Sequence, residues 1–154
     1  MATVELLLPP LAAHVRTARI IGVAAARRAG LDDDHVADLR LALGESCARA
    51  VALHLEHAPD TPIRVVVRDD ATGLTVEVTD AGPPATLPTA AVDLLDLDDT
   101  VTDPQVALTV LAGIVEDLVV TPLASGTTVT LKWLLPPKEA GTGRAAVSSL
   151  TGDL

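Results

Sequence analysis

The sequence predicts an α+β fold: a two-layer sandwich in which helices cover one face of a mostly antiparallel sheet. Two observations predict it. Hydrophobic residues recur with a helical period over residues 11–57 and with a period of two over residues 63–80, so helices and strands are grouped rather than strictly alternating. In addition, no glycine-rich turn joins a predicted strand to a predicted helix, as a dinucleotide-binding unit requires.

Length and composition limit the possible classes. The chain has 154 residues, 49% of them hydrophobic and 21% charged, which suits one folded domain with a substantial core. Aromatic residues make up 1% and the net charge is −10, so base stacking and attraction to phosphates are both weak. We therefore expect no nucleic-acid partner. The single cysteine, Cys47, excludes an internal disulfide and a cysteine-based zinc site.

No targeting or membrane segment is expected. The first residues lack the basic stretch of a signal peptide, and Pro9-Pro10 interrupts the first apolar run. The longest apolar stretch, residues 106–115, is too short to cross a bilayer. These features predict a cytoplasmic protein without a membrane partner.

The N-terminal part predicts a strand and two helices. Residues 4–8 form the strand, which ends at Pro9-Pro10. Residues 11–29 form an alanine-rich helix that ends at Gly30, a residue suited to a C-cap. The second helix begins at residues 32–34, where acidic side chains suit its positive end, and runs to about His57. Its apolar residues recur at helical spacing: Val36, Leu39, Leu43, Cys47 and Ala50.

Strands dominate the remainder. A hairpin is expected from residues 63–68 and 74–80, which alternate around a polar turn. A helix over residues 106–115 and strands over residues 118–121 and 127–134 complete the predicted domain, which spans residues 1–135.

Two segments carry no clear period. Residues 81–104 are rich in Pro, Thr and Asp and predict a long loop that acts as a lid. Its acidic residues are Asp93, Asp96, Asp98, Asp99 and Asp103. Residues 136–154 predict a disordered tail.

Two polar residues are expected to face the core at the ends of neighbouring strands. Asp80 shares the parity of Val76 and Val78, and Thr127 shares the parity of Val129 and Leu131. A buried carboxylate needs hydrogen-bond donors. Asp80 is therefore either the cap of the turn that follows its strand or an acceptor for a ligand donor such as a purine amine.

Other polar residues on the second helix have simpler interpretations. Glu45 and Arg49 are four residues apart, a spacing typical of a surface ion pair. His54 and His57 have no third ligand near them, so we expect a solvated helix end rather than a zinc site.

Three segments resemble motifs of one family in the expected order. They are Leu-Arg-Leu-Ala-Leu-Gly-Glu-Ser-Cys at residues 39–47, Val-Thr-Asp-Ala-Gly-Pro-Pro at residues 78–84 and Gly-Thr-Thr-Val at residues 126–129. Over residues 3–134 the sequence resembles the bacterial anti-sigma-factor serine kinases. These belong to the ATPase superfamily that includes gyrase, sensor histidine kinases and the MutL repair proteins.

The resemblance implies a sandwich that binds ATP or ADP beneath a flexible lid. Glu45 matches the general base, and Asp80 matches the carboxylate that accepts the adenine amine. Gly82 matches the glycine beside that carboxylate, and Thr127 the threonine near the adenine. The family acts as a homodimer that sequesters a sigma factor and phosphorylates a serine of a small antagonist protein.

Three departures from the family pattern concern phosphate and metal. Arg49 stands where the family has an asparagine that helps to hold magnesium, and a guanidinium has no acceptor for a cation. Gln105 and Ala107, after Pro104, replace the phosphate-binding glycines. The acidic lid repels a triphosphate. The adenine end is therefore expected to be retained and magnesium to be lost.

The resemblance and its departures together predict a degenerate member of this family. It would control transcription by binding a sigma factor or its antagonist, with weak or absent kinase activity. Arg16 and Arg19 on the first helix are the expected partner contacts. One alternative is an active protein-serine kinase that uses Glu45 as base and Arg49 as an electrostatic clamp. Another is a dimerisation scaffold without catalysis.

Overall fold

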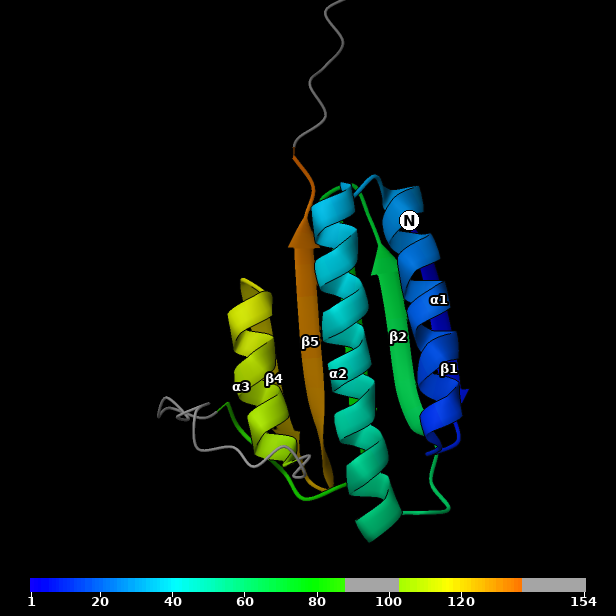
Figure 1. The fold of residues 1–154 in the computed structure, drawn as a ribbon, viewed down its shortest axis with the longest axis vertical. Helices are drawn as coiled ribbons and strands as arrows, with labels where there is room; N and C mark the ends of the chain where they lie inside the picture. Colours follow the sequence, from blue (N-terminus) through cyan, green and yellow to red (C-terminus); the bar gives the residue numbers. More distant parts are fainter. Residues whose placement is uncertain (88–102, 137–154) are drawn as a thin grey trace, which may run out of the picture.

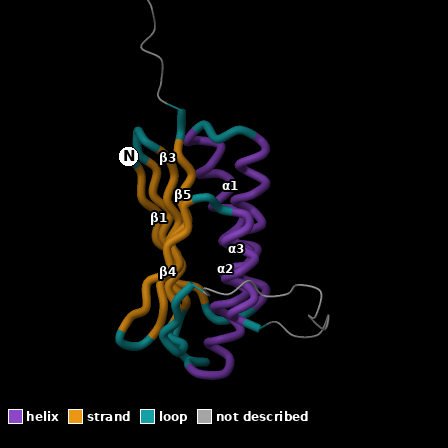
Figure 2. The backbone as a smooth tube through the Cα atoms, turned by 90° about the vertical axis from the view of Figure 1, so that its left-hand side faces the viewer, coloured by secondary structure: helices purple, strands orange, loops and turns teal. Residues whose placement is uncertain are grey.

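Three helices cover one face of a five-stranded antiparallel sheet in the computed structural model, which describes residues 1–87 and 103–136 (Figures 1 and 2). The predicted fold class is thereby confirmed. The strands are β1 (Ala2–Leu8), β2 (Ile63–Asp69), β3 (Gly73–Asp80), β4 (Asp117–Leu123) and β5 (Gly126–Leu134). The helices are α1 (Ala12–Ala29), α2 (Asp33–His57) and α3 (Pro104–Ile114).

The order of strands in the sheet differs from their order in the chain. It is β1-β2-β3-β5-β4, and every neighbouring pair is antiparallel. After β3 the chain passes through α3 to the edge strand β4 and returns as β5, which pairs with β3 (Figure 1). This crossing places the ends of β3 and β5 side by side beneath the helices.

The helix termini follow the predicted signals. Gly30 ends α1 with a φ of 96°, and the N–H of Leu31 donates to the carbonyl of Ala26. This left-handed cap suits glycine because a side chain is strained there. The carboxylate of Asp32 caps α2 by accepting from the N–H of His35 at 2.9 Å. A cap of this kind contributes about 1 kcal/mol.

The core between the two layers is aliphatic. Its fully buried side chains include Leu39, Leu43, Leu108, Leu111 and Leu131, and the only tryptophan, Trp133, is also buried. Gly22 lets α1 approach α2 closely, because a Cβ at this position would lie 2.5 Å from a methyl group of Leu43. Dense packing of this kind supplies the main stabilisation of the sandwich.

The opposite face of the sheet carries polar side chains in pairs. Arg64 donates to Glu5 and Arg68 donates to Glu77, each at 2.8 Å. This polar face explains the alternating pattern of the strands, since one face packs on the helices and the other meets solvent.

Two predicted segments fall mainly outside the described residues. Of the acidic lid residues, Asp93, Asp96, Asp98 and Asp99 lie there, as does nearly all of the predicted tail. Of the helices that the structure describes, none combines the length and the apolar character that crossing a membrane requires.

Candidate functional site

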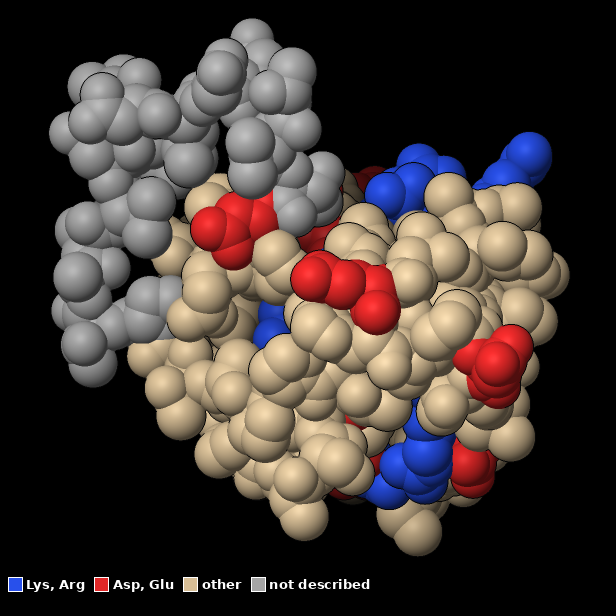
Figure 3. All heavy atoms as spheres, turned by 90° about the horizontal axis from the view of Figure 1, so that it is seen from below, with Lys and Arg blue, Asp and Glu red and all other residues tan. Residues whose placement is uncertain are grey.

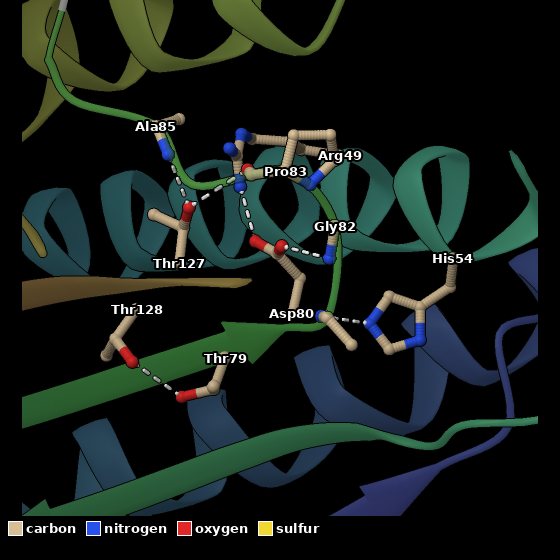
Figure 4. A network of polar contacts seen from close by, with 10 residues as sticks. Arg49, His54, Thr79, Asp80, Gly82, Pro83, Ala85, Thr127 and Thr128 are labelled. Atoms are coloured by element: carbon tan, nitrogen blue, oxygen red, sulfur yellow. Dashed lines mark hydrogen bonds and ion pairs between the residues drawn. The ribbon is translucent and has the colours of Figure 1, made fainter. Parts of the chain in front are cut away.

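The candidate site lies where β3 ends and β5 begins. Asp80 and Thr127 are direct partners in the antiparallel register, and both side chains face the helices (Figure 4). Asp80 is 3% exposed and Thr127 is fully buried. The inward orientation predicted from strand parity is therefore confirmed for both residues. The crossing connection through α3 is what brings them together.

Both carboxylate oxygens of Asp80 have donors from within the chain. Its Oδ1 accepts from the N–H of Gly82 at 2.9 Å, so Asp80 does cap the turn after its strand. Its Oδ2 accepts from Nη1 of Arg49 at 2.7 Å (Figure 4). The side chains of this ion pair are 2% and 1% exposed. The interpretation of Asp80 as a turn cap is therefore confirmed, its other oxygen accepts from an arginine of α2, and a role in binding adenine stays a prediction.

Arg49 does not lie where the sequence analysis expected it. The predicted surface ion pair with Glu45 is wrong: Arg49 is buried, and its partner is Asp80. Its Nε is also buried and has no hydrogen-bond partner among the described residues. Glu45 is half-buried, and within residues 1–87 and 103–136 it forms no ion pair. The helical spacing agrees with the burial of Arg49, because Arg49 lies three residues after buried Ser46 and four before buried Leu53, on the same face of α2.

Thr127 holds the chain that follows β3. Its hydroxyl accepts from the N–H of Ala85 at 2.9 Å and donates to the carbonyl of Pro83 at 3.5 Å. A threonine on β5 thus fixes the segment that leads toward the predicted lid. One lone pair of this hydroxyl stays free and its donor contact to Pro83 is long, so Thr127 keeps capacity for a further hydrogen bond.

His54 is a site residue that the sequence analysis missed. The expectation of a solvated side chain is wrong for it, since His54 is 0% exposed. Its Nε2 accepts from the N–H of Ala81 at 2.8 Å, which requires the proton of a neutral ring to be on Nδ1. Nδ1 then donates to the carbonyl of Thr61 at 2.8 Å. His54 lies seven residues after Cys47, so it continues the core-facing stripe of α2.

The N-terminus of α3 is capped by an acidic side chain. Asp103 accepts from the N–H of Gln105 at 2.9 Å, and Pro104 at the first helical position has no N–H. Aspartate is a favourable cap because its negative charge stabilises the positive end of the helix. The same charge opposes a phosphate at this helix end.

A cavity of about 440 Å³ lies between these groups. Its lining includes Arg49, Leu53, Pro83, Pro84, Asp103 and Gln105. Figure 3 views the molecule from this end, where acidic and basic side chains lie in small separate groups and neither sign dominates the visible surface. The cavity therefore combines apolar walls with an arginine and an aspartate that are each already engaged.

The residues present do not fit Mg-ATP. Among the described residues, no group of three or more His, Cys, Asp or Glu side chains is placed to hold a metal ion. The carboxylate expected to meet the adenine amine meets Arg49, and the helix end expected to meet phosphate meets Asp103. The residues matched to the adenine are all in place, but the chain itself supplies their partners.

The two expected partner contacts on α1 differ in accessibility. Arg16 is exposed. Arg19 is half-buried: its guanidinium lies against Gly44 of α2, where a Cβ on residue 44 would be, and its Nε is buried and donates to no described residue. Arg16 is therefore the freer of the two for a partner.

Comparisons with known proteins agree with this architecture. Residues 8–133 match the family model of the histidine kinase-like ATPase domain. Among solved structures, the chain is similar to the RsbU and RsbW domains of Rv1364c from Mycobacterium tuberculosis, with a TM-score of 0.63 and 19% identity. That similarity covers 88% of this chain and 34% of the other, so this chain spans about a third of that chain's length. No protein of curated function matches the chain.

Proposed function

Since the chain belongs to the histidine kinase-like ATPase family, we propose that it is an anti-sigma-type regulator. It controls transcription by binding a sigma factor, an antagonist of that interaction, or both, and its kinase activity is weak or absent. It acts as a homodimer. The observation that carries the proposal is the buried ion pair between Arg49 and Asp80 in the part of the fold where this family houses a nucleotide.

This ion pair argues against phosphotransfer on two grounds. Nη1 of Arg49 is already committed to Asp80, which leaves it poorly placed to clamp a phosphate near Glu45. A nucleotide that used Asp80 would also have to leave the guanidinium buried without a counter-ion, which is strongly unfavourable. Glu45 remains the residue matched to the general base, half-buried on α2.

Protein binding remains available to a domain without catalysis. The three segments that resemble the anti-sigma-factor kinases, and the similar fold in a chain that carries an RsbW domain, support the class of partner. The surface of α1 supports the place of contact: α1 contains four arginines and no acidic residue, although the whole chain has a net charge of −10. Of these arginines, Arg16 and Arg27 are exposed and pair with no described carboxylate, whereas Arg28 pairs with Asp69. Exposed positive charge of this kind favours an acidic surface on the partner.

Affinity purification from the native cell tests the proposal. We expect the wild-type chain to retain a sigma factor or a small antagonist protein. Arg16→Glu should reduce this retention at least tenfold, because it reverses a charge on the proposed contact face. Arg68→Ala is the matched control, since Arg68 lies on the far face of the sheet and pairs with Glu77. A preparation with neither partner supports the scaffold alternative.

A phosphotransfer assay tests the proposal that kinase activity is weak or absent. With Mg-ATP and the recovered antagonist, we expect no serine phosphorylation above background. Robust phosphorylation that Glu45→Ala abolishes would overturn the proposal and establish the active kinase instead.

A further inference from the structure

We propose that the guanidinium of Arg49 occupies the place of the adenine amine and that the carboxylate of Asp103 occupies the place of a phosphate. Arg49 is the residue that excludes adenine nucleotides from this domain. The inference rests on the proposed function and concerns how partner binding is regulated: the chain binds its partner independently of ATP and ADP. It also assigns a specific role to each of the two residues.

The first step concerns the base end. The amino edge of adenine and the guanidinium of arginine are both planar groups with N–H donors, so both suit a carboxylate acceptor. Arg49 presents such a donor to Oδ2 of Asp80 at 2.7 Å, while the N–H of Gly82 holds Oδ1 at 2.9 Å. Because Arg49 belongs to the same chain, its effective concentration at Asp80 is far above that of any free ligand.

The second step concerns the phosphate end. The N-terminus of a helix of eleven residues attracts anions through its free N–H groups. In α3, the carboxylate of Asp103 takes the N–H of Gln105, and Pro104 supplies no donor. A fixed negative charge thus lies where the negative charge of a phosphate would otherwise be stabilised.

The third step is that both residues line one cavity. Its volume of about 440 Å³ falls in the range of pockets that bind small ligands. Leu53, Pro83 and Pro84 give it apolar walls, and the buried Nε of Arg49 has no partner among the described residues. Truncation of Arg49 therefore enlarges an existing space and frees Asp80 as an acceptor.

Calorimetric titration with adenosine and with ADP, both without magnesium, tests the proposal on the full chain. Wild-type protein should bind neither ligand at millimolar concentration. Arg49→Ala should bind adenosine with a dissociation constant at least ten times below the highest concentration at which the wild type shows no binding. The double variant with Arg49→Ala and Asp103→Ser should bind ADP at least five times more tightly than Arg49→Ala alone and should bind adenosine equally well. Serine still caps the helix but carries no charge. Arg68→Ala is the control and should resemble the wild type.

If Arg49→Ala does not fold, the titration of the wild-type protein still tests the proposal. Saturable binding of adenosine or ADP by the unmodified chain overturns the proposal, and so does a folded Arg49→Ala variant that binds no adenosine. Repeating the affinity purification with ATP or ADP present provides a second readout. We expect equal partner recovery under both conditions, and recovery that depends on the nucleotide contradicts the inference. Loss of the partner under every condition instead contradicts the proposed function.

Discussion

Arg49 of α2 and Asp80 of β3 form a buried ion pair, 2.7 Å between Nη1 and Oδ2, across 31 positions of the chain. The pair links the helical layer to the end of the central strand of the sheet. It also places a permanent positive charge beside Asp80, which among the described residues is the buried carboxylate at this end of the molecule. The same ion pair is therefore the basis of the proposed exclusion of adenine nucleotides and of a strong coupling in stability.

The two partners should be strongly coupled in stability. We expect Arg49→Met or Asp80→Leu alone to lower the free energy of unfolding by about 3–5 kcal/mol, because each leaves a buried charge without its counter-ion. The double variant should recover most of that loss, since it leaves neither charge behind. Urea denaturation of the four proteins measures the coupling. Additive losses in the double variant would show that the pair does not act as a unit.

His54 should contribute far more to stability than His57. We expect His54→Ala to cost about 2–4 kcal/mol, because it leaves a cavity and removes the partners of the Ala81 N–H and the Thr61 carbonyl. His57→Ala, on the partly exposed last turn of α2, should change stability by less than about 0.5 kcal/mol. Thermal denaturation of both variants at neutral pH provides the comparison. Equal effects would contradict the buried network.

Cys47 should react only when the protein unfolds. Burial raises the pKa of its thiol to about 12, so the reactive thiolate is almost absent at neutral pH and the sulfur is also inaccessible. An aromatic disulfide reagent should therefore label the native protein negligibly at pH 8 and label it completely in urea. Rapid stoichiometric labelling without denaturant would show that the packing around Cys47 is open.

Asp69 should stabilise the protein in a pH-dependent manner. The guanidinium of Arg28 and the backbone N–H of Ala2 both donate to the carboxylate of Asp69, and these hydrogen bonds lower the pKa of Asp69 below the ordinary value of 3.8. Because the folded state favours the ionised form, this stabilisation is present above the unfolded pKa and is lost as the pH falls through the folded pKa. Asp69→Asn should thus lower the urea midpoint at pH 7.

The deficit of Asp69→Asn should shrink once the pH falls below about 3.8. Asp60→Asn, at an exposed position in the turn after α2, is the control and should leave the midpoint at pH 7 nearly unchanged. A deficit for Asp69→Asn that stays constant from pH 7 to pH 2 would contradict the electrostatic cause.

Local chemistry in the sequence determined most of the fold. The period of two in β2 and β3, the cap residues Gly30 and Asp32, and the alternation that turned Asp80 and Thr127 inward depend on neighbours a few residues away. Such signals are readable without long-range contacts. The family resemblance rested on the same short segments, and the match over residues 8–133 agrees with it.

Only the tertiary structure decided the long-range contacts of these side chains, whereas the contact of Asp80 with the N–H of Gly82 was one of the two interpretations that the sequence allowed. The register between β3 and β5 and the packing of α2 across them brought Arg49 to Asp80, whereas helical spacing alone favoured Glu45 as its partner. The N–H of Ala81 likewise reaches Nε2 of His54 across 27 positions, a contact that no local pattern predicts. The physical reason is that a buried polar group must be satisfied by whichever donor or acceptor the fold brings to it, and for Arg49 and for Nε2 of His54 that partner is distant in sequence.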